Sequence, residues 1–178
     1  LLRRLQNKRQ LSINEQCIAD LKFLLSVLEK CRDGIDMNSI AYRRPTHVYR
    51  SDSCPAGLGG YSDEGFAWRF YLPSEIQFRA SNNLLEHIAA IITMWVDILA
   101  GRLKHGDCAL SMTDSTTSAG WLRKSNFIED DESPIQATIR LEVARHHALH
   151  YLQTGIREYS QWFRGVENKV ADALSRDD

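Results

Sequence analysis

The chain has 178 residues, of which 43% are hydrophobic and 25% charged, and its formal net charge is -1. This composition is ordinary for a folded domain and excludes a wholly disordered chain. The near-zero charge argues against a protein that binds nucleic acid by non-specific electrostatics alone, although a local basic groove would be enough to bind phosphates.

The cysteines and the hydropathy pattern indicate the compartment. The four cysteines are widely spaced and include no C-x-x-C pair, which disfavours a zinc knuckle or a disulfide framework. Free thiols fit a reducing compartment, so we expect an intracellular protein, in the cytoplasm or the nucleus. No apolar run approaches the roughly 20 residues that span a bilayer, so no membrane is expected among its partners. Because the first residue is Leu, we expect a fragment of a longer polypeptide.

The first predicted element is a helical arm. Ser12, with Glu15 three residues later, forms a capping-box pattern, and Gly34 is expected to end the helix. Between them runs an apolar stripe at helical spacing, formed by Cys17, Leu21, Leu24 and Leu28. Residues 34–45 read as a connector. We therefore predict a helical arm and connection segment over residues 1–45 and a separate domain over residues 46–178.

A strand-rich stretch follows the connector. Residues 46–53 alternate as a strand does, and residues 55–60 supply turn chemistry before short strands at 60–62 and 66–72. A long helix comes next, with Asn82 or Asn83 as its N-cap and apolar positions that repeat every three or four residues.

Strands and helices then alternate. The pattern predicts a strand at 108–113, helices at 115–124 and 133–152, a strand at 158–163 and a helix at 168–176. The order is β-β-β-α-β-α-α-β-α after the arm. Antiparallel strands first and helix-linked strands later indicate an α/β fold in which helices cover a mixed sheet.

Four acidic residues stand where phosphodiester chemistry would use them. Asp52 lies inside the first strand, Glu86 in the first turn of the long helix, Asp114 at the end of the fourth strand and Asp172 early in the last helix. An acid inside a strand is costly unless it faces a site. Two-metal cleavage needs several carboxylates that converge from distant parts of the chain, because hard cations prefer oxygen ligands.

Each acid taken alone also has a purely structural interpretation. An acid early in a helix commonly complements the helix dipole, which is the alternative for Glu86 and Asp172. Asp114 and Asp52 could equally serve as cap or turn residues. It is the combination of four acids in one order of elements that favours a metal site.

Four segments carry a resemblance to a known family. Residues 52–61 (DSCPAGLGGY) resemble the pattern D-A-S-x-x-G-x-G-A, and residues 81–91 (SNNLLEHIAAI) are similar to T-N-N-x-x-E-L-x-A. Residues 112–115 (MTDS) contain T-D-S, and residues 166–176 (VENKVADALSR) match N-x-x-A-D-x-L-S-R, the most specific of the four. Residues 46–176 thus resemble the ribonuclease H domain of a retroelement (retrotransposon) reverse transcriptase, which implies a five-stranded mixed sheet flanked by helices.

The resemblance also implies a function and a site. It implies a metal-dependent endonuclease that hydrolyses the RNA strand of RNA–DNA hybrids and that belongs to a polyprotein with an attached polymerase domain. Asp52, Glu86, Asp114 and Asp172 would be the catalytic residues and would bind two Mg²⁺ ions, for which Mn²⁺ can substitute.

Four further residues are expected to contact the hybrid. These candidates for substrate binding are Asn82, Asn83, Ser115 and Arg79. The two asparagines would reach the minor groove, where the 2′-hydroxyl distinguishes RNA from DNA. N-capping is the alternative for each asparagine, and for Ser115 a cap of the following short helix is the favoured interpretation.

The sequence departs from the family pattern at two places, and two other functions are alternatives. Cys54 stands where the pattern has Ser, and the short segment 163–167 lacks the His that many cellular relatives carry before the last Asp. The alternatives are a DNA nuclease of the same fold and a catalytically silent tether or nucleic-acid-binding module. The presence of all four acids weighs against the silent module.

Overall fold

The computed structural model describes residues 13–35, 43–77, 79–124 and 133–177. It divides into two compact units, Leu1–Gly34 and Ile35–Asp178. In the first unit, helix α1 (Glu15–Lys30) begins after Asn14, whose Oδ1 accepts a hydrogen bond from the backbone N of Cys17 at 2.8 Å. The helical arm is confirmed but its limits are wrong, because α1 ends at Lys30, before Gly34. Ser12 and most of the predicted connector (36–42) lie outside the described residues.

The second unit is built on a five-stranded mixed sheet with strand order β3-β2-β1-β4-β5. The strands are β1 (His47–Cys54), β2 (Gly57–Ser62), β3 (Ala67–Tyr71), β4 (Cys108–Thr113) and β5 (Arg157–Trp162). β2 pairs antiparallel with both β1 and β3, whereas β4 pairs parallel with both β1 and β5. The predicted order of elements and the mixed sheet are confirmed.

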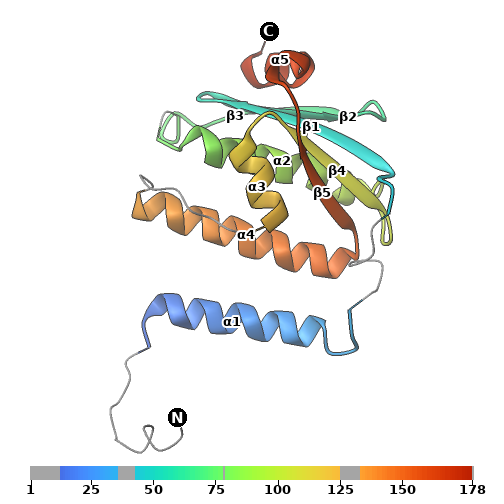
Figure 1. The fold of residues 1–178 in the computed structure, drawn as a ribbon. Coiled ribbons are helices and arrows are strands. Elements are labelled where there is room, and N and C mark those ends of the chain that lie inside the picture. Colours follow the sequence, from blue (N-terminus) through green and yellow to red (C-terminus); the bar gives the residue numbers. More distant parts are fainter. Residues whose placement is uncertain (1–12, 36–42, 78, 125–132, 178) are drawn as a thin grey trace, which may run out of the picture. The chain divides into compact units, whose positions relative to one another are not determined.

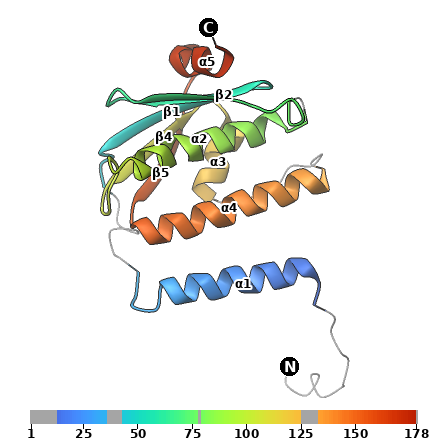
Figure 2. The same cartoon turned by 180° about the vertical axis from the view of Figure 1, so that it is seen from behind.

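Helices cover both faces of this sheet. They are α2 (Asn82–Leu99), α3 (Thr116–Lys124), α4 (Pro134–Thr154) and α5 (Lys169–Arg176), with a short 3-10 turn over Gly165–Glu167 before α5. Figures 1 and 2 show α2, α3 and α4 on one face and α5 alone on the other. Within the part of the chain that the structure describes, every helix is too short or too polar to cross a bilayer.

Helix α2 is the central packing element. Its N-cap is Ser81, whose Oγ accepts a hydrogen bond from the backbone N of Leu84 at 3.3 Å. The predicted caps Asn82 and Asn83 are wrong, because both already belong to the helix. Apolar residues of α2 belong to two core clusters. One cluster consists of Leu58, Leu72, Leu85 and Ala89. The other consists of Tyr49, Met94, Leu103, Ala109 and Ile156.

The glycines after β1 have a different role from the predicted one. Only Pro55 and Ala56 connect the strands, and β2 already begins at Gly57. A Cβ on Gly57 would lie 2.5 Å from the backbone O of Ser175, and a Cβ on Gly59 would lie 2.7 Å from its backbone N. The glycines therefore allow α5 to approach the strand closely, and the prediction of a turn over 55–60 is wrong for residues 57–60, which belong to β2.

Gly59→Ala tests this close approach. The added Cβ would meet the backbone of α5, so we expect a loss of about 1–3 kcal/mol in the free energy of unfolding. Urea denaturation followed by circular dichroism would measure it.

The matched control is Gly120→Ala in α3, where no heavy atom lies within 4 Å of an added Cβ. Because Ala favours a helix over Gly, this control is expected to be neutral or to stabilise by up to about 1 kcal/mol. Equal stability of Gly59→Ala and the wild type would contradict the close-packing interpretation.

Candidate metal centre

Three elements bring acidic residues to one edge of the sheet. β1 and β4 are parallel, so their carboxyl ends lie at the same edge, with Asp52 near the end of β1 and Asp114 directly after β4. Glu86 is the fifth residue of α2, which packs across β1. The prediction that Glu86 lies in the first turn is therefore wrong by a residue, since the first turn of α2 holds no acid.

The side chains of these acids converge. Asp52, Glu86 and Asp114 each offer an oxygen, and the three oxygens lie within 4.8 Å of one another. Asp52 is 6% exposed and Glu86 4% exposed, whereas Asp114 is partly buried. Such a set of carboxylate oxygens, close together and shielded from water, matches the ligand preference of Mg²⁺ and Mn²⁺.

The hydrogen bonds at the cluster leave ligand capacity unused. Glu86 Oε1 accepts from the backbone N of Ser53 at 3.1 Å and from its Oγ at 2.9 Å. Glu86 Oε2 is buried and has no hydrogen-bond partner among the described residues. Leaving a buried carboxylate oxygen unpaired is costly, and a cation would satisfy it. The residues present therefore fit a divalent metal ion.

The electrostatics point the same way. Burial, followed by the charge of Asp52, raises the pKa of Glu86 to about 8 against the lowering effect of the Ser53 hydrogen bonds. Burial also raises the pKa of Asp52 to about 6, although a hydrogen bond from Ser175 lowers it. The pKa of Asp114 is raised as well, chiefly by burial. A dication would reverse this balance by stabilising the ionised carboxylates.

Asp172 lies beside the cluster but is not part of it. Its charge raises the pKa of Asp52 and of Asp114, which places it nearby. Its Oδ1, however, accepts a hydrogen bond from Arg176 Nε at 2.6 Å, and its side chain is 48% exposed. Of the four acids named from the sequence, the structure thus brings three together and turns the fourth toward Arg176.

The four residues named as substrate contacts lie near the ends of α2 and α3. Asn82 is exposed at the first position of α2, Asn83 follows it, and Arg79 is exposed in the turn before the helix. Ser115 Oγ accepts a hydrogen bond from the backbone N of Ser118 at 3.1 Å, which is the capping role favoured from the sequence.

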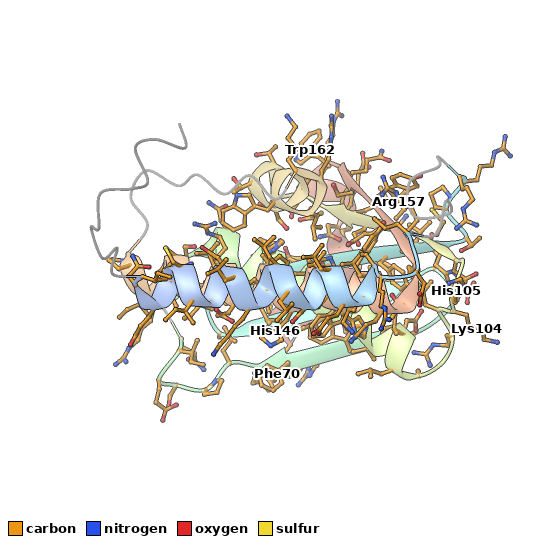
Figure 3. All side chains as sticks on the ribbon, turned by 90° about the horizontal axis from the view of Figure 1, so that it is seen from below. Phe70, Lys104, His105, His146, Arg157 and Trp162 are labelled. Carbon is orange, nitrogen blue, oxygen red and sulfur yellow. The ribbon has the colours of Figure 1, made fainter. Side chains whose placement is uncertain are left out.

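Several residues that support the site were missed. Ser53 and Ser175 each hydrogen-bond one of the buried carboxylates. A Cβ on Gly165 would lie 2.7 Å from Asp114 Oδ2, so the turn before α5 runs directly against that acid. Trp162, which is labelled in Figure 3, lies at the end of β5. Its Nε1 donates a hydrogen bond to the backbone O of Asp114 at 2.8 Å. The i,i+3 spacing on one helix indicates only that Ser175 lies on the same side of α5 as Asp172, and no local pattern indicates its contact with Asp52.

Comparison with known proteins identifies the fold. No protein-family model matches the chain, and no curated protein matches it. Among solved structures, LC11-RNase H1 in complex with an RNA/DNA hybrid superposes with a TM-score of 0.54 at 12% identity, covering 74% of this chain and 95% of that chain. The N-terminal RNase H domain of Rv2228c from Mycobacterium tuberculosis, solved as a fusion with maltose-binding protein, gives 0.51 at 17% identity, covering 74% and 91%.

The chain has the ribonuclease H fold. The foamy virus protease-reverse transcriptase gives a TM-score of 0.48 at 12% identity, with 78% of this chain and 21% of that chain covered. The fold assignment rests on structures that score above 0.5, such as the first two, and at these identities they show the fold alone.

Glu86→Gln tests the electrostatics of the cluster. Because the pKa of Glu86 is about 8 in the folded chain and ordinary in the unfolded chain, the folded chain binds more protons between about pH 4.5 and 8. The free energy of unfolding of the metal-free wild type should therefore fall as pH rises through this window, by about 1.4 kcal/mol per pH unit. Glu86→Gln should remove most of this fall and be more stable at pH 8, measured by urea denaturation with chelator.

The control variant is Glu142→Gln on α4, whose carboxylate is 48% exposed and pairs with Arg145. Its free energy of unfolding should change with pH as that of the wild type does. Adding Mg²⁺ at pH 8 should then stabilise the wild type more than Glu86→Gln. Parallel stability curves for Glu86→Gln and the wild type would count against a buried, ionisable cluster.

Proposed function

We propose that this chain is a metal-dependent ribonuclease H, an endonuclease that hydrolyses the RNA strand of RNA–DNA hybrids. The observation that carries the proposal is the convergence of Asp52, Glu86 and Asp114 in a buried cluster at the carboxyl edge of a ribonuclease H fold. The complex of LC11-RNase H1 with an RNA/DNA hybrid supports the choice of substrate. The four sequence motifs that resemble this family support it independently.

The acids would hold two divalent ions, Mg²⁺ or in its place Mn²⁺. The chemistry supplied by such ions is activation of the attacking water and stabilisation of charge on the leaving oxygen. The ligand oxygens would already be in position before a metal ion binds. The packed elements β1, β4 and α2 place the side chains of Asp52, Glu86 and Asp114 there. Asp172 would complete the set of four if it exchanged its pair with Arg176 for a metal ion.

The start of α2 is the proposed contact with the hybrid. Asn82 is exposed four residues before Glu86, which is about 6 Å along the helix axis. With Asn83 it would present amide groups to the minor groove about one helical turn from Glu86, where the 2′-hydroxyl marks the RNA strand. Arg79, exposed just before the helix, would contact a phosphate. Ser115 would support the site through its cap of α3.

The wider context is part of the same proposal. The ending V-E-N-K-V-A-D-A-L-S-R resembles that of retroelement reverse transcriptases. We therefore propose that the domain works in a polyprotein beside a polymerase domain, inside the cell, and that the arm connects the two.

Cleavage of a labelled hybrid tests the proposal. With Mg²⁺ or Mn²⁺ the wild type should cut the RNA strand, and chelator should stop it. Asp114→Asn should lose more activity than the roughly 10–100-fold that loss of an outer-shell partner costs, because it removes a metal ligand. Gel analysis of end-labelled RNA would measure this.

Asp107→Asn is the matched control, because Asp107 precedes β4 at the opposite end from Asp114 and accepts from the backbone N of Lys104 at 2.7 Å. An asparagine retains an acceptor there, so full activity is expected. Metal-independent cutting would contradict the proposal. Equal cutting of duplex DNA would indicate a DNA nuclease, and binding without cleavage a silent tether.

A further inference from the structure

We propose that Ser175 is a positioning residue whose hydroxyl orients Asp52 in the acidic cluster, so that helix α5 sets the metal affinity of the site. This inference rests on the metal centre of the proposed function. It assigns to α5 a role beyond supplying Asp172.

The first observation is the contact itself. Ser175 is 3% exposed, and its Oγ lies 2.8 Å from Asp52 Oδ2 and 2.9 Å from the backbone O of Asp172. A hydroxyl has one proton to donate, and an ionised carboxylate is a stronger acceptor than a peptide carbonyl. The proton therefore goes to Asp52 whenever that side chain is charged, which is the state that binds metal.

The second observation is that no other hydrogen bond to Asp52 among the described residues replaces this contact. Among the described residues, Ser175 supplies the one hydrogen bond that the Asp52 carboxylate receives. Glu86 is different, because its Oε1 is held by both the backbone N and the Oγ of Ser53. Loss of the Ser175 hydroxyl should therefore free the carboxylate of Asp52 to rotate. Loss of the Ser53 hydroxyl should leave Glu86 with one donor, the backbone N of Ser53.

The third observation is that Ser175 cannot easily move away. The Cys54 thiol donates to the backbone O of Ser175 at 3.1 Å. Gly57 and Gly59 let the backbone of Ser175 approach β2 more closely than any side chain would permit. The hydroxyl is thus fixed relative to β1, the strand that carries Asp52, and its position is built into the packing of α5.

These contacts make α5 a part of the metal centre. Partners that orient a metal-binding carboxylate typically account for 10–100-fold in metal affinity or activity. We expect Ser175→Ala to weaken Mn²⁺ binding by about this factor, because the carboxylate of Asp52 loses its fixed orientation. Ser53→Ala should weaken it less, since the backbone donor to Glu86 remains.

Mn²⁺ binding to the full chain without nucleic acid, followed by electron paramagnetic resonance, measures the effect apart from catalysis. Ser62→Ala is the matched control: Ser62 is 3% exposed on β2, and its Oγ has no hydrogen-bond partner among the described residues. It should bind Mn²⁺ as the wild type does. In cleavage assays, Ser175→Ala should need 10–100-fold more metal for half-maximal activity while the KM for the hybrid stays unchanged.

The outcomes separate the two proposals. Wild-type affinity in Ser175→Ala, or equal weakening in Ser62→Ala, would overturn the positioning role. Should Ser175→Ala fail to fold, Ser175→Cys keeps the side-chain size with a weaker donor, and wild-type affinity there would overturn the role too. If the wild type binds Mn²⁺ but does not cut the hybrid, only the proposed nuclease activity is refuted. Absence of Mn²⁺ binding to the wild type would overturn both.

Discussion

The burial of acidic side chains close to one another is the constraint on which this structure depends. Asp52 and Glu86 are almost fully shielded from water, and this burial raises the free energy of ionising each of them. The charge of Asp114, which stands beside them, raises it further. A pKa of about 8 for Glu86 means that the folded chain bears this cost near neutral pH unless a proton or a cation enters the cluster. Such an arrangement weakens the fold and is useful chiefly for binding a cation.

The rest of the second unit reads as support for that cluster. Parallel pairing of β1 with β4 places two of the acids at one edge, and α2 adds the third from across the sheet. On the other face α5 lies against β1, β2 and β3, closer than side chains on Gly57 and Gly59 would allow. The hydroxyls of Ser53 and Ser175 reach the carboxylates from the strand and from α5, so both faces of the sheet contribute to their orientation.

How far the sequence predicts this arrangement depends on the range of the interactions. Hydrophobic periodicity gave the order of the elements, and the position of Asp52 in β1 and of Asp114 after β4 predicted that they meet. The helix caps were predicted wrongly, because neighbouring polar residues compete for the same capping position. Asn14 caps α1 and Ser81 caps α2, in place of the residues that the sequence analysis predicted. The glycines of β2 were predicted to form a turn. The backbone of α5, which packs against them, lies more than a hundred residues away in the sequence, so no local pattern indicates their role. The contact between Ser175 and Asp52 is equally remote in sequence and could not be read from a pattern.

The orientation of Asp172 follows from the same balance. Its pair with Arg176 joins side chains that are 48% and 55% exposed, and exposed ion pairs contribute only about 0–1 kcal/mol. The charges of Asp52 and Asp114 repel Asp172, whereas Arg176 attracts it and accounts for its outward orientation. A dication in the cluster would reverse the sign of that field, and the weak pair with Arg176 offers little resistance to rotation. The proposed fourth ligand is therefore held away from the cluster only by an ion pair that costs little to break.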